Sequence, residues 1–481
     1  MSALIPELWD SNRLSFIRHV LSPSRLVAGK FSKEIIKPSS PTPHDKKLHN
    51  LSLLDQIVPP FFVAMVFYYP NLDKPPKTSE SVYETTQALK QSLSKTLSRF
   101  YPLAGRIRDQ FSIDCNDEGV PFVVTKFHKN LTNFLRNPEL SADRAHLPGQ
   151  LNLDDPGLGS EVAMFQVNHY ECGGIVIGAL FHHKLADGHS MGLFMKDWAS
   201  NTRDPRALRP GPIFDFNSFF PHNPAMKRDS HVYTVVKKYF KVGKPVIRRY
   251  AFNDVAISKL RAKLDGGPAR PTRVEVVTAV VWKWFMAAVG ARGDDNNNPV
   301  PLSVITHLVN MRKKVDPPFL ENSFGNFVWL QPVTSPNDGP CRDLARLFGK
   351  VRGGISKVDS GFVERMAGRD GFSGYVENVK DTWKEFPEKA DYVSCSSWCN
   401  FGLYGVDFGW GKPVWITKGH ADSESEWPFL NVLWLMDTRG GDGIEAWLTL
   451  DEHYAAAFDQ VKEFRDLAMV NPSPLDLAGI N

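Results

Sequence analysis

Residues 181–188 read Phe181-His182-His183-Lys184-Leu185-Ala186-Asp187-Gly188, and a short apolar run bounded by glycines, residues 173–181, leads into them. Such a run, rich in branched side chains, predicts a buried strand. His183 would lie at the end of this strand and Asp187 just beyond it, where side chains are held rigidly and still reach a cleft. Because an imidazole has an unperturbed pKa of about 6.5, His183 is a candidate general base at neutral pH.

The spacing of His183 and Asp187 alone leaves a surface pair or a helix cap open as alternatives. A second segment, residues 404–413, reads Tyr-Gly-Val-Asp-Phe-Gly-Trp-Gly-Lys-Pro. Glycines around a phenylalanine and a tryptophan predict a sharply bent backbone that is held by large rings. The two segments together therefore favour a functional site over a chance pairing of His183 and Asp187.

The sequences His-x-x-x-Asp-Gly (183–188) and Asp-Phe-Gly-Trp-Gly (407–411) resemble the signature motifs of the plant BAHD acyltransferases, which transfer acyl groups from coenzyme A thioesters to alcohols or amines. Further segments follow in the family's order and rough spacing: residues 36–43, 51–56, 100–106, 309–312, 323–326 and 442–447. The resemblance covers nearly the whole chain and is strongest to the branch of alkaloid acetyltransferases.

The resemblance implies an α/β fold of two similarly folded halves with mixed sheets and helices, like chloramphenicol acetyltransferase, with the active-site channel at their interface. We expect an N-terminal extension over residues 1–32, disordered or a start-site artefact, and an N-terminal acyltransferase domain with the His-x-x-x-Asp motif over 33–205. A crossover linker rich in Pro, Asp, Asn and Arg would span 206–234, and a C-terminal acyltransferase domain 235–481. The segment near 400–425 is expected to pack with the first domain.

Local patterns predict the individual elements of both halves. Helices are expected over residues 81–100, 191–202, 255–264 and 274–289, the third capped by Asn253 or Asp254. Strands are expected over residues 106–115, 121–125, 163–168, 173–181 and 246–252.

The resemblance also implies roles for the motif residues. His183 would take the proton of the acceptor hydroxyl during attack on the thioester and then protonate the departing thiolate of coenzyme A. Asp187 would point away from the cleft and pair with Arg312, which makes it a structural support rather than part of a relay. Asp407 is either a catalytic acid or, as we prefer, structural. The other residues expected to be structural are Gly188, Phe408, Gly409, Trp410 and Gly411.

Two further assignments are open to a structural alternative. Trp398 resembles a tryptophan that donates to the oxyanion in hydroxycinnamoyl-transferring relatives, although a tryptophan in this setting also serves packing. Thr272 and Arg273 begin a helix, and a helix start beside a basic side chain suits a phosphate of coenzyme A. The same residues also form an ordinary helix cap.

Direct transfer through a ternary complex is expected, because no Gly-x-Ser-x-Gly elbow and no cysteine with a neighbouring base is found. The missing elbow also argues against a hydrolase, and intact motifs argue against a non-catalytic binding or regulatory homologue. A metal site at Cys395 and Cys399 with His182 and His183 is less favoured than buried thiols, because no second tight ligand pair accompanies them. We therefore expect no metal and no tightly bound cofactor, with acyl-CoA as co-substrate.

Composition agrees with these expectations. The 481 residues are 42% hydrophobic and carry a net charge of +4, and the 57 basic residues are scattered, so nucleic acid is not an expected partner. No apolar run reaches the length of a membrane span. Five widely spaced cysteines, Cys341 among them, indicate a reducing compartment. We expect a cytoplasmic monomer that acts on a hydroxylated small molecule, an alkaloid or terpenoid; organelle targeting by the arginines of residues 1–30 is the alternative.

Overall fold

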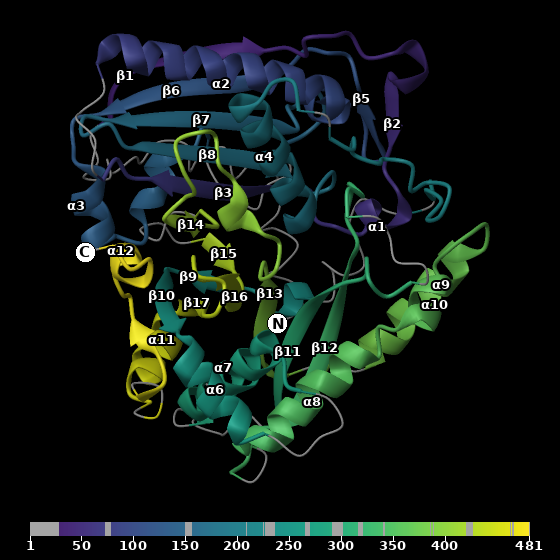
Figure 1. The fold of residues 1–481 in the computed structure, drawn as a ribbon. Helices are drawn as coiled ribbons and strands as arrows, with labels where there is room; N and C mark the ends of the chain where they lie inside the picture. Colours follow the sequence, from purple (N-terminus) through teal and green to yellow (C-terminus); the bar gives the residue numbers. More distant parts are fainter. Residues whose placement is uncertain are drawn as a thin grey trace.

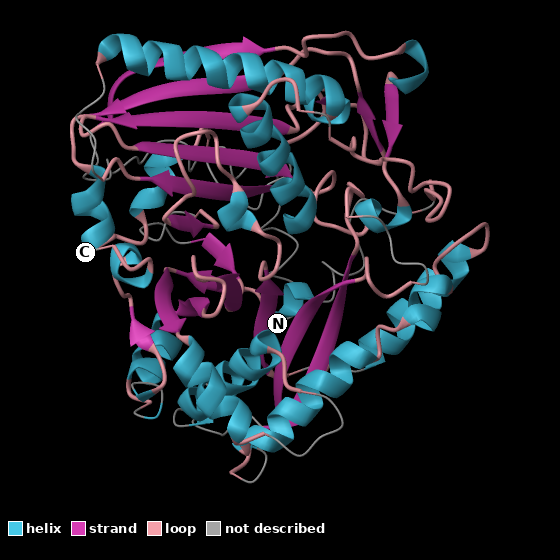
Figure 2. Ribbon diagram, in the orientation of Figure 1, coloured by secondary structure: helices cyan, strands magenta, loops and turns pink. Residues whose placement is uncertain are grey.

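A computed structural model describes residues 28–72, 78–149, 156–207, 209–224, 226, 236–264, 270–290, 302–315, 321–339, 342–384, 386–387, 389–419, 427–461, 463 and 466–480. The chain forms two α/β halves, each built on a mixed sheet, and they lie one above the other in Figures 1 and 2. The expected fold class is confirmed. Residues 1–27 of the expected N-terminal extension, part of the crossover linker and Cys341 lie outside the described residues.

The N-terminal sheet has the strand order β1-β6-β7-β8-β3-β14 within the described residues. Its strands are β1 (Ala28–Ile36), β6 (Val120–Phe127), β7 (Ala163–Tyr170), β8 (Ile175–His182), β3 (Phe62–Tyr69) and β14 (Trp415–Thr417). The glycine-bounded run of the sequence is β8, and all eight of its residues are buried. β1 begins at Ala28, ahead of the residue 33 at which we expected the domain to start.

Helices α2 (Ser79–Arg99) and α4 (Gly188–Arg203) cover one face of this sheet (Figure 1). Thr78 caps α2 by accepting from the Ser81 amide, and Leu89 and Leu93 are fully buried on its inner face. The indole of Trp198 on α4 donates to the Leu89 carbonyl at 3.1 Å, which joins the two helices. α4 therefore starts at a fixed place over the end of β8.

The predicted strand over residues 106–115 is wrong as a continuous element. The chain there forms two short strands, β4 (Arg106–Ile107) and β5 (Ser112–Asp114), which pair with each other, and β5 also pairs with β2 (Leu48–Asn50). Asp109 accepts hydrogen bonds from the Phe111 amide and the Ser112 hydroxyl, and this side-chain turn reverses the chain.

The C-terminal sheet has the strand order β12-β11-β13-β16-β17-β10-β18 within the described residues. Its strands are β12 (Val328–Pro336), β11 (Leu302–Asn310), β13 (Asp391–Ser397), β16 (Val432–Asp437), β17 (Ile444–Asp451), β10 (Pro245–Phe252) and β18 (Met469–Val470). A separate pair is formed by β9 (Lys241–Gly243) and β15 (Trp427–Phe429).

The apolar helix α7 (Arg273–Gly290) packs on this sheet, and α6 (Asp254–Ala262) begins at the cap Asn253, whose side chain accepts from the Ala256 amide. Helix α8 (Leu344–Ser356) packs beside α7 in the same core, and together with α10 (Gly371–Lys384) it forms the long diagonal in Figure 1. The remaining helices are α1 (Leu53–Gln56), α3 (Leu131–Arg136), α9 (Ser360–Glu364), α11 (Glu452–Asp459) and α12 (Pro474–Leu477).

Two connections hold the halves together. β14, which follows the second motif, is hydrogen-bonded to β3 of the N-terminal sheet, while the Trp415 indole donates to Glu445 of β17 at 3.2 Å. Glu445 is itself buried against Arg249 of β10 at 2.6 Å. On the other side, α1 packs its leucines against Met311 and Phe327 in a shared core.

Candidate active site

His183 occupies the first position after β8. Its amide donates to the Phe61 carbonyl at 2.8 Å, and the Leu185 amide turns back to the His182 carbonyl at 3.0 Å. Its ring meets Phe61 edge-on, with 5.7 Å between ring centroids, and keeps part of its surface exposed. The sequence placed His183 at the strand end, and the structure puts it in the tight turn that follows.

Asp187 ends this turn as the N-cap of α4 and accepts the Ser190 amide at 2.9 Å. Arg312 donates to both carboxylate oxygens, at 2.6 and 3.0 Å, and both side chains are 4% exposed. The expected ion pair is thus present and bidentate. Burial opposes the charge, but Arg312 more than offsets it and holds the pKa of Asp187 below its ordinary value.

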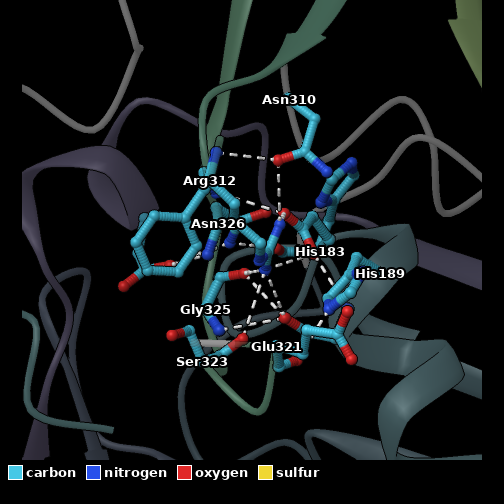
Figure 3. A network of polar contacts seen from close by, with 12 residues as sticks. His183, His189, Asn310, Arg312, Glu321, Ser323, Gly325 and Asn326 are labelled. Carbon is cyan, nitrogen blue, oxygen red and sulfur yellow. Dashed lines mark hydrogen bonds and ion pairs between the residues drawn. The ribbon is translucent and has the colours of Figure 1, made fainter. Parts of the chain in front are cut away.

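The pair also fixes a loop of the C-terminal half. Phe327 donates its amide to Asp187 at 3.1 Å, and Arg312 reaches the Gly325 carbonyl at 3.1 Å and the Ser190 hydroxyl at 2.9 Å. Figure 3 shows Arg312 at the centre of this network, between Asn310, Gly325 and Asn326. The turn that carries His183 is therefore held from both halves.

Asn326 is a site residue to which the sequence analysis gave no role. Its side-chain amide donates to the His183 carbonyl at 2.8 Å (Figure 3) and also to Asp55 at 2.9 Å. Among the described residues, Oδ1 of Asn326 and Nδ1 of His183 are buried without hydrogen-bond partners. A polar amide at the end of the resembling segment 323–326 is the signal that could have pointed to it.

The environment favours the neutral form of the His183 imidazole. Burial lowers the pKa of His183, and the charge of Asp187 and the side chain of Asn326 oppose that shift only in part. The ring is accordingly able to accept a proton at neutral pH and below.

Trp398 lies beside the same turn, directly after β13. A Cβ atom added at Gly188 would lie 2.5 Å from the Trp398 Nε1, so this close approach requires a glycine. The ring also stacks edge-on against Trp434, with centroids 5.0 Å apart. Within the described part of the chain, the Trp398 Nε1 makes no hydrogen bond, which leaves it available as a donor; its catalytic role stays a prediction.

Asp407 stabilises the turn in which it lies. Its carboxylate accepts the amides of Gly409 and Gly411 at 2.8 and 3.0 Å, and these glycines have φ of 107° and 114°, a region that favours glycine. Phe408 and Trp410 stack with centroids 5.4 Å apart. These contacts support the structural alternative for Asp407 and its neighbours.

Thr272 and Arg273 form the helix start that we considered. Thr272 and Glu275 make a reciprocal cap of α7, and Arg273 donates to Asp437 at 3.0 Å and to the Gly443 carbonyl at 3.2 Å. Both therefore have structural partners. They also line an open cavity of about 300 Å³ together with Arg261, Arg270, Pro271, Val274 and Asn400.

The described residues contain no group of three His, Cys, Asp or Glu that could hold a metal ion, and Cys395 and Cys399 are buried free thiols. Among the helices that the structure describes, none is long and apolar enough to cross a membrane.

Comparison with known proteins adds to this geometry. The profile of the Transferase family matches residues 29–465. A limonoid 7-O-acetyltransferase of Citrus sinensis is 36% identical over 463 residues, which cover 92% of this chain and 98% of that protein. A salutaridinol 7-O-acetyltransferase of Papaver somniferum is 32% identical over 470 residues, with 89% and 95% covered.

Solved structures agree in fold. The crystal structure of vinorine synthase superposes with a TM-score of 0.72 at 30% identity, covering 91% of this chain and 98% of that one. TRI101 of F. graminearum, in complex with coenzyme A and T-2 mycotoxin, has a TM-score of 0.65 at 16% identity, with 88% and 99% covered.

Proposed function

Because this chain is an acyltransferase of the BAHD (Transferase) family, we propose that it transfers an acetyl or other short acyl group from acyl-CoA to a hydroxyl of an alkaloid or terpenoid. The observation that carries the proposal is the turn of His183, which holds a neutral imidazole by a buried ion pair at the seam of two halves. O-acetyltransferases of specialised metabolites match nearly the full chain and support the acetyl donor.

The proposed reaction uses one base and no covalent intermediate. His183 takes the proton of the acceptor hydroxyl while the hydroxyl oxygen forms a bond to the thioester carbonyl carbon. The oxyanion of the tetrahedral intermediate accepts a hydrogen bond, for which Trp398 is our candidate donor. The carbon–sulfur bond then breaks, and His183 returns the proton to the thiolate of coenzyme A.

Acyl-CoA is a co-substrate in this proposal, not a resident cofactor. The cavity at the start of α7 is the proposed site for its phosphates, because Arg261, Arg270 and Arg273 gather positive charge there. Burial and then the charges of Arg270 and Arg273 lower the pKa of Arg261. The mutual repulsion of these guanidinium groups would be relieved by a bound anion. Arg261→Ala and Arg270→Ala should raise KM for acyl-CoA with little change in kcat, whereas Arg136→Ala, an exposed arginine of α3, should not.

We further propose a cytoplasmic monomer. Both halves that meet at His183 belong to one chain, so no second subunit is needed to complete the turn. Buried free thiols at Cys115, Cys395 and Cys399 are consistent with a reducing compartment.

The test is an incubation of purified protein with a panel of acyl-CoAs and hydroxylated alkaloids or terpenoids, followed by detection of free coenzyme A and of the acylated product by mass spectrometry. Release that requires the acceptor and disappears in His183→Ala supports the proposal. Release without any acceptor would identify a hydrolase, and acceptor binding without release would favour the binding homologue.

A further inference from the structure

Asp55 is a buried carboxylate on α1, 5% exposed, with hydrogen bonds to both oxygens. Oδ2 accepts from the amide and hydroxyl of Ser52, at 3.0 and 2.7 Å, which closes a capping box around the short helix. Oδ2 of Asp55 therefore stabilises the local structure of α1. Oδ1 has no part in the capping box.

Oδ1 of Asp55 points to the opposite half of the molecule. It accepts from the backbone amide of Asn326 at 2.8 Å and from its side-chain Nδ2 at 2.9 Å. The same Nδ2 donates to the His183 carbonyl at 2.8 Å. Three residues from distant parts of the chain therefore form one continuous path, from Asp55 through Asn326 to His183.

The charge of Asp55 decides which way the amide of Asn326 faces. A carboxylate only accepts hydrogen bonds, so Nδ2 must turn toward Asp55, and Oδ1 is then directed to the other side. Oδ1 of Asn326 has no hydrogen-bond partner in the described residues, and Asn326 raises the pKa of His183 against the effect of burial. With this orientation, the hydrogen bond from Nδ2 to the His183 carbonyl at 2.8 Å fixes the main chain that carries the imidazole.

The carboxylate is costly to bury, and among the described residues no cation forms an ion pair with it. Burial raises the pKa of Asp55 to about 6, although the hydrogen bonds of Ser52 and Asn326 lower it. The charged groups around it have other partners: Lys184 donates to the Gln56 carbonyl at 3.0 Å, and Arg312 pairs with Asp187 across the loop. A neutral cap would serve α1 without this cost.

We propose that Asp55 is a positioning residue for acyl transfer, which acts on His183 by fixing the orientation of the Asn326 amide. The proposal rests on the proposed function and assigns the control of the base to a residue far from it in sequence. Its charge-assisted hydrogen bonds are stronger than those of a neutral amide, so the geometry is fixed before substrates bind.

The experiment compares Asp55→Asn with Asp391→Asn. Asp391 is a matched control, because it is also a buried carboxyl with a pKa raised by burial to about 6, bound by Tyr454 at 2.8 Å in the C-terminal sheet. Asp55→Asn leaves the Asn326 amide free to flip. For Asp55→Asn we expect kcat to fall by about 10- to 100-fold, with KM for both substrates within about twofold of the wild type. Asp391→Asn should lose a similar amount of melting temperature but keep the wild-type kcat.

The pKa of His183 is a second readout that needs no turnover. NMR titration of protein with ¹³C-labelled histidine, assigned by His183→Gln, should show a lower His183 pKa in Asn326→Ala, which removes a side chain that raises it, and in Asp55→Asn, which lets that side chain turn away. The kcat losses of these two variants should not multiply in the double variant. If the wild type transfers no acyl group, the titration alone still decides about Asp55, separately from the proposed function.

Ser52→Ala keeps the proposal testable if Asp55→Asn does not fold. It removes the hydroxyl hydrogen bond to Oδ2 and keeps the backbone amide bond to Oδ2 and both bonds to Oδ1, so the pKa of Asp55 should rise and the acidic limb of the kcat profile should move to higher pH. An unchanged His183 pKa in Asp55→Asn, an unmoved limb in Ser52→Ala, or a kcat loss that merely parallels that of Asp391→Asn would each overturn the proposal.

Discussion

Breaking the ion pair of Asp187 and Arg312 should destabilise the fold far more than removing both charges. Arg312→Met leaves Asp187 buried with only the amides of Ser190 and Phe327, at 2.9 and 3.1 Å. Removing one member of a buried pair typically costs about 3–5 kcal/mol, because the other charge stays without its partner. For a chain of this size, that corresponds to a fall in melting temperature of roughly 3–5 °C.

The assay is thermal and urea unfolding of Arg312→Met, Asp187→Asn and the double variant, with coenzyme A release measured in parallel. The double variant should lose less than the sum of the single ones, with a coupling energy of about 1–3 kcal/mol. Lys384→Met breaks the exposed pair with Asp381, whose side chains are 76% and 74% exposed, and should leave unfolding unchanged. Additive losses for residues 187 and 312 would refute the reasoning.

The pH dependence gives an independent check of the same pair. The pKa of Asp187 is lower in the folded than in the unfolded state, so its contribution is fully present above pH ~4 and is lost as the pH falls through the folded-state value. The stability difference between wild type and Asp187→Asn should therefore be constant between neutral pH and about pH 5 and shrink in stronger acid. A difference that grows on acidification would contradict the assignment.

Three further predictions concern the reaction. His183→Ala should lower kcat by about 10²- to 10⁴-fold without loss of melting temperature, and because burial lowers the pKa of His183, the wild type should stay active somewhat below pH 6.5; near wild-type turnover of the variant would remove the base assignment. Gly188→Ala should displace the Trp398 ring and cost about 1–3 kcal/mol in stability together with a loss of kcat, whereas Gly211→Ala, which meets open space, should do neither; equal behaviour of the two would argue against a role for the close contact. Initial rates at varied donor and acceptor should give intersecting lines, and parallel lines with an acylated protein would demand a missed nucleophile.

Local periodicity predicted the elements that are decided by local burial. The glycine-bounded run became β8, and the expected helices over 81–100 and 274–289 match α2 and α7 within two residues at each end. The predicted strand over 106–115 failed where a single side chain, Asp109, competes with the ladder for backbone groups. The pattern of apolar and polar residues does not reveal that a side chain will take the hydrogen bonds of the backbone.

The site was predictable only where a motif carries it. His183, Asp187 and Arg312 followed from the resemblance, and their contact is present in the structure. Asn326 and Asp55 meet across 271 positions of the chain, and such a contact leaves no trace in spacing. For Thr272 and Arg273 the sequence could not decide between a helix cap and a phosphate site, and the structure shows features of both: structural partners and a basic cavity.

The pairing of β14 with β3 has a consequence for the order of events during translation. β3 is the apolar stretch Phe-Val-Ala-Met-Val-Phe-Tyr-Tyr, and its second neighbour arrives only with residues 415–417. At roughly 5–20 residues per second, the roughly 235 residues that separate His182 from Thr417 take about 10–50 s to synthesise. Throughout that interval, the nascent chain presents an open apolar strand edge, the surface that chaperones recognise and that seeds aggregation during overexpression.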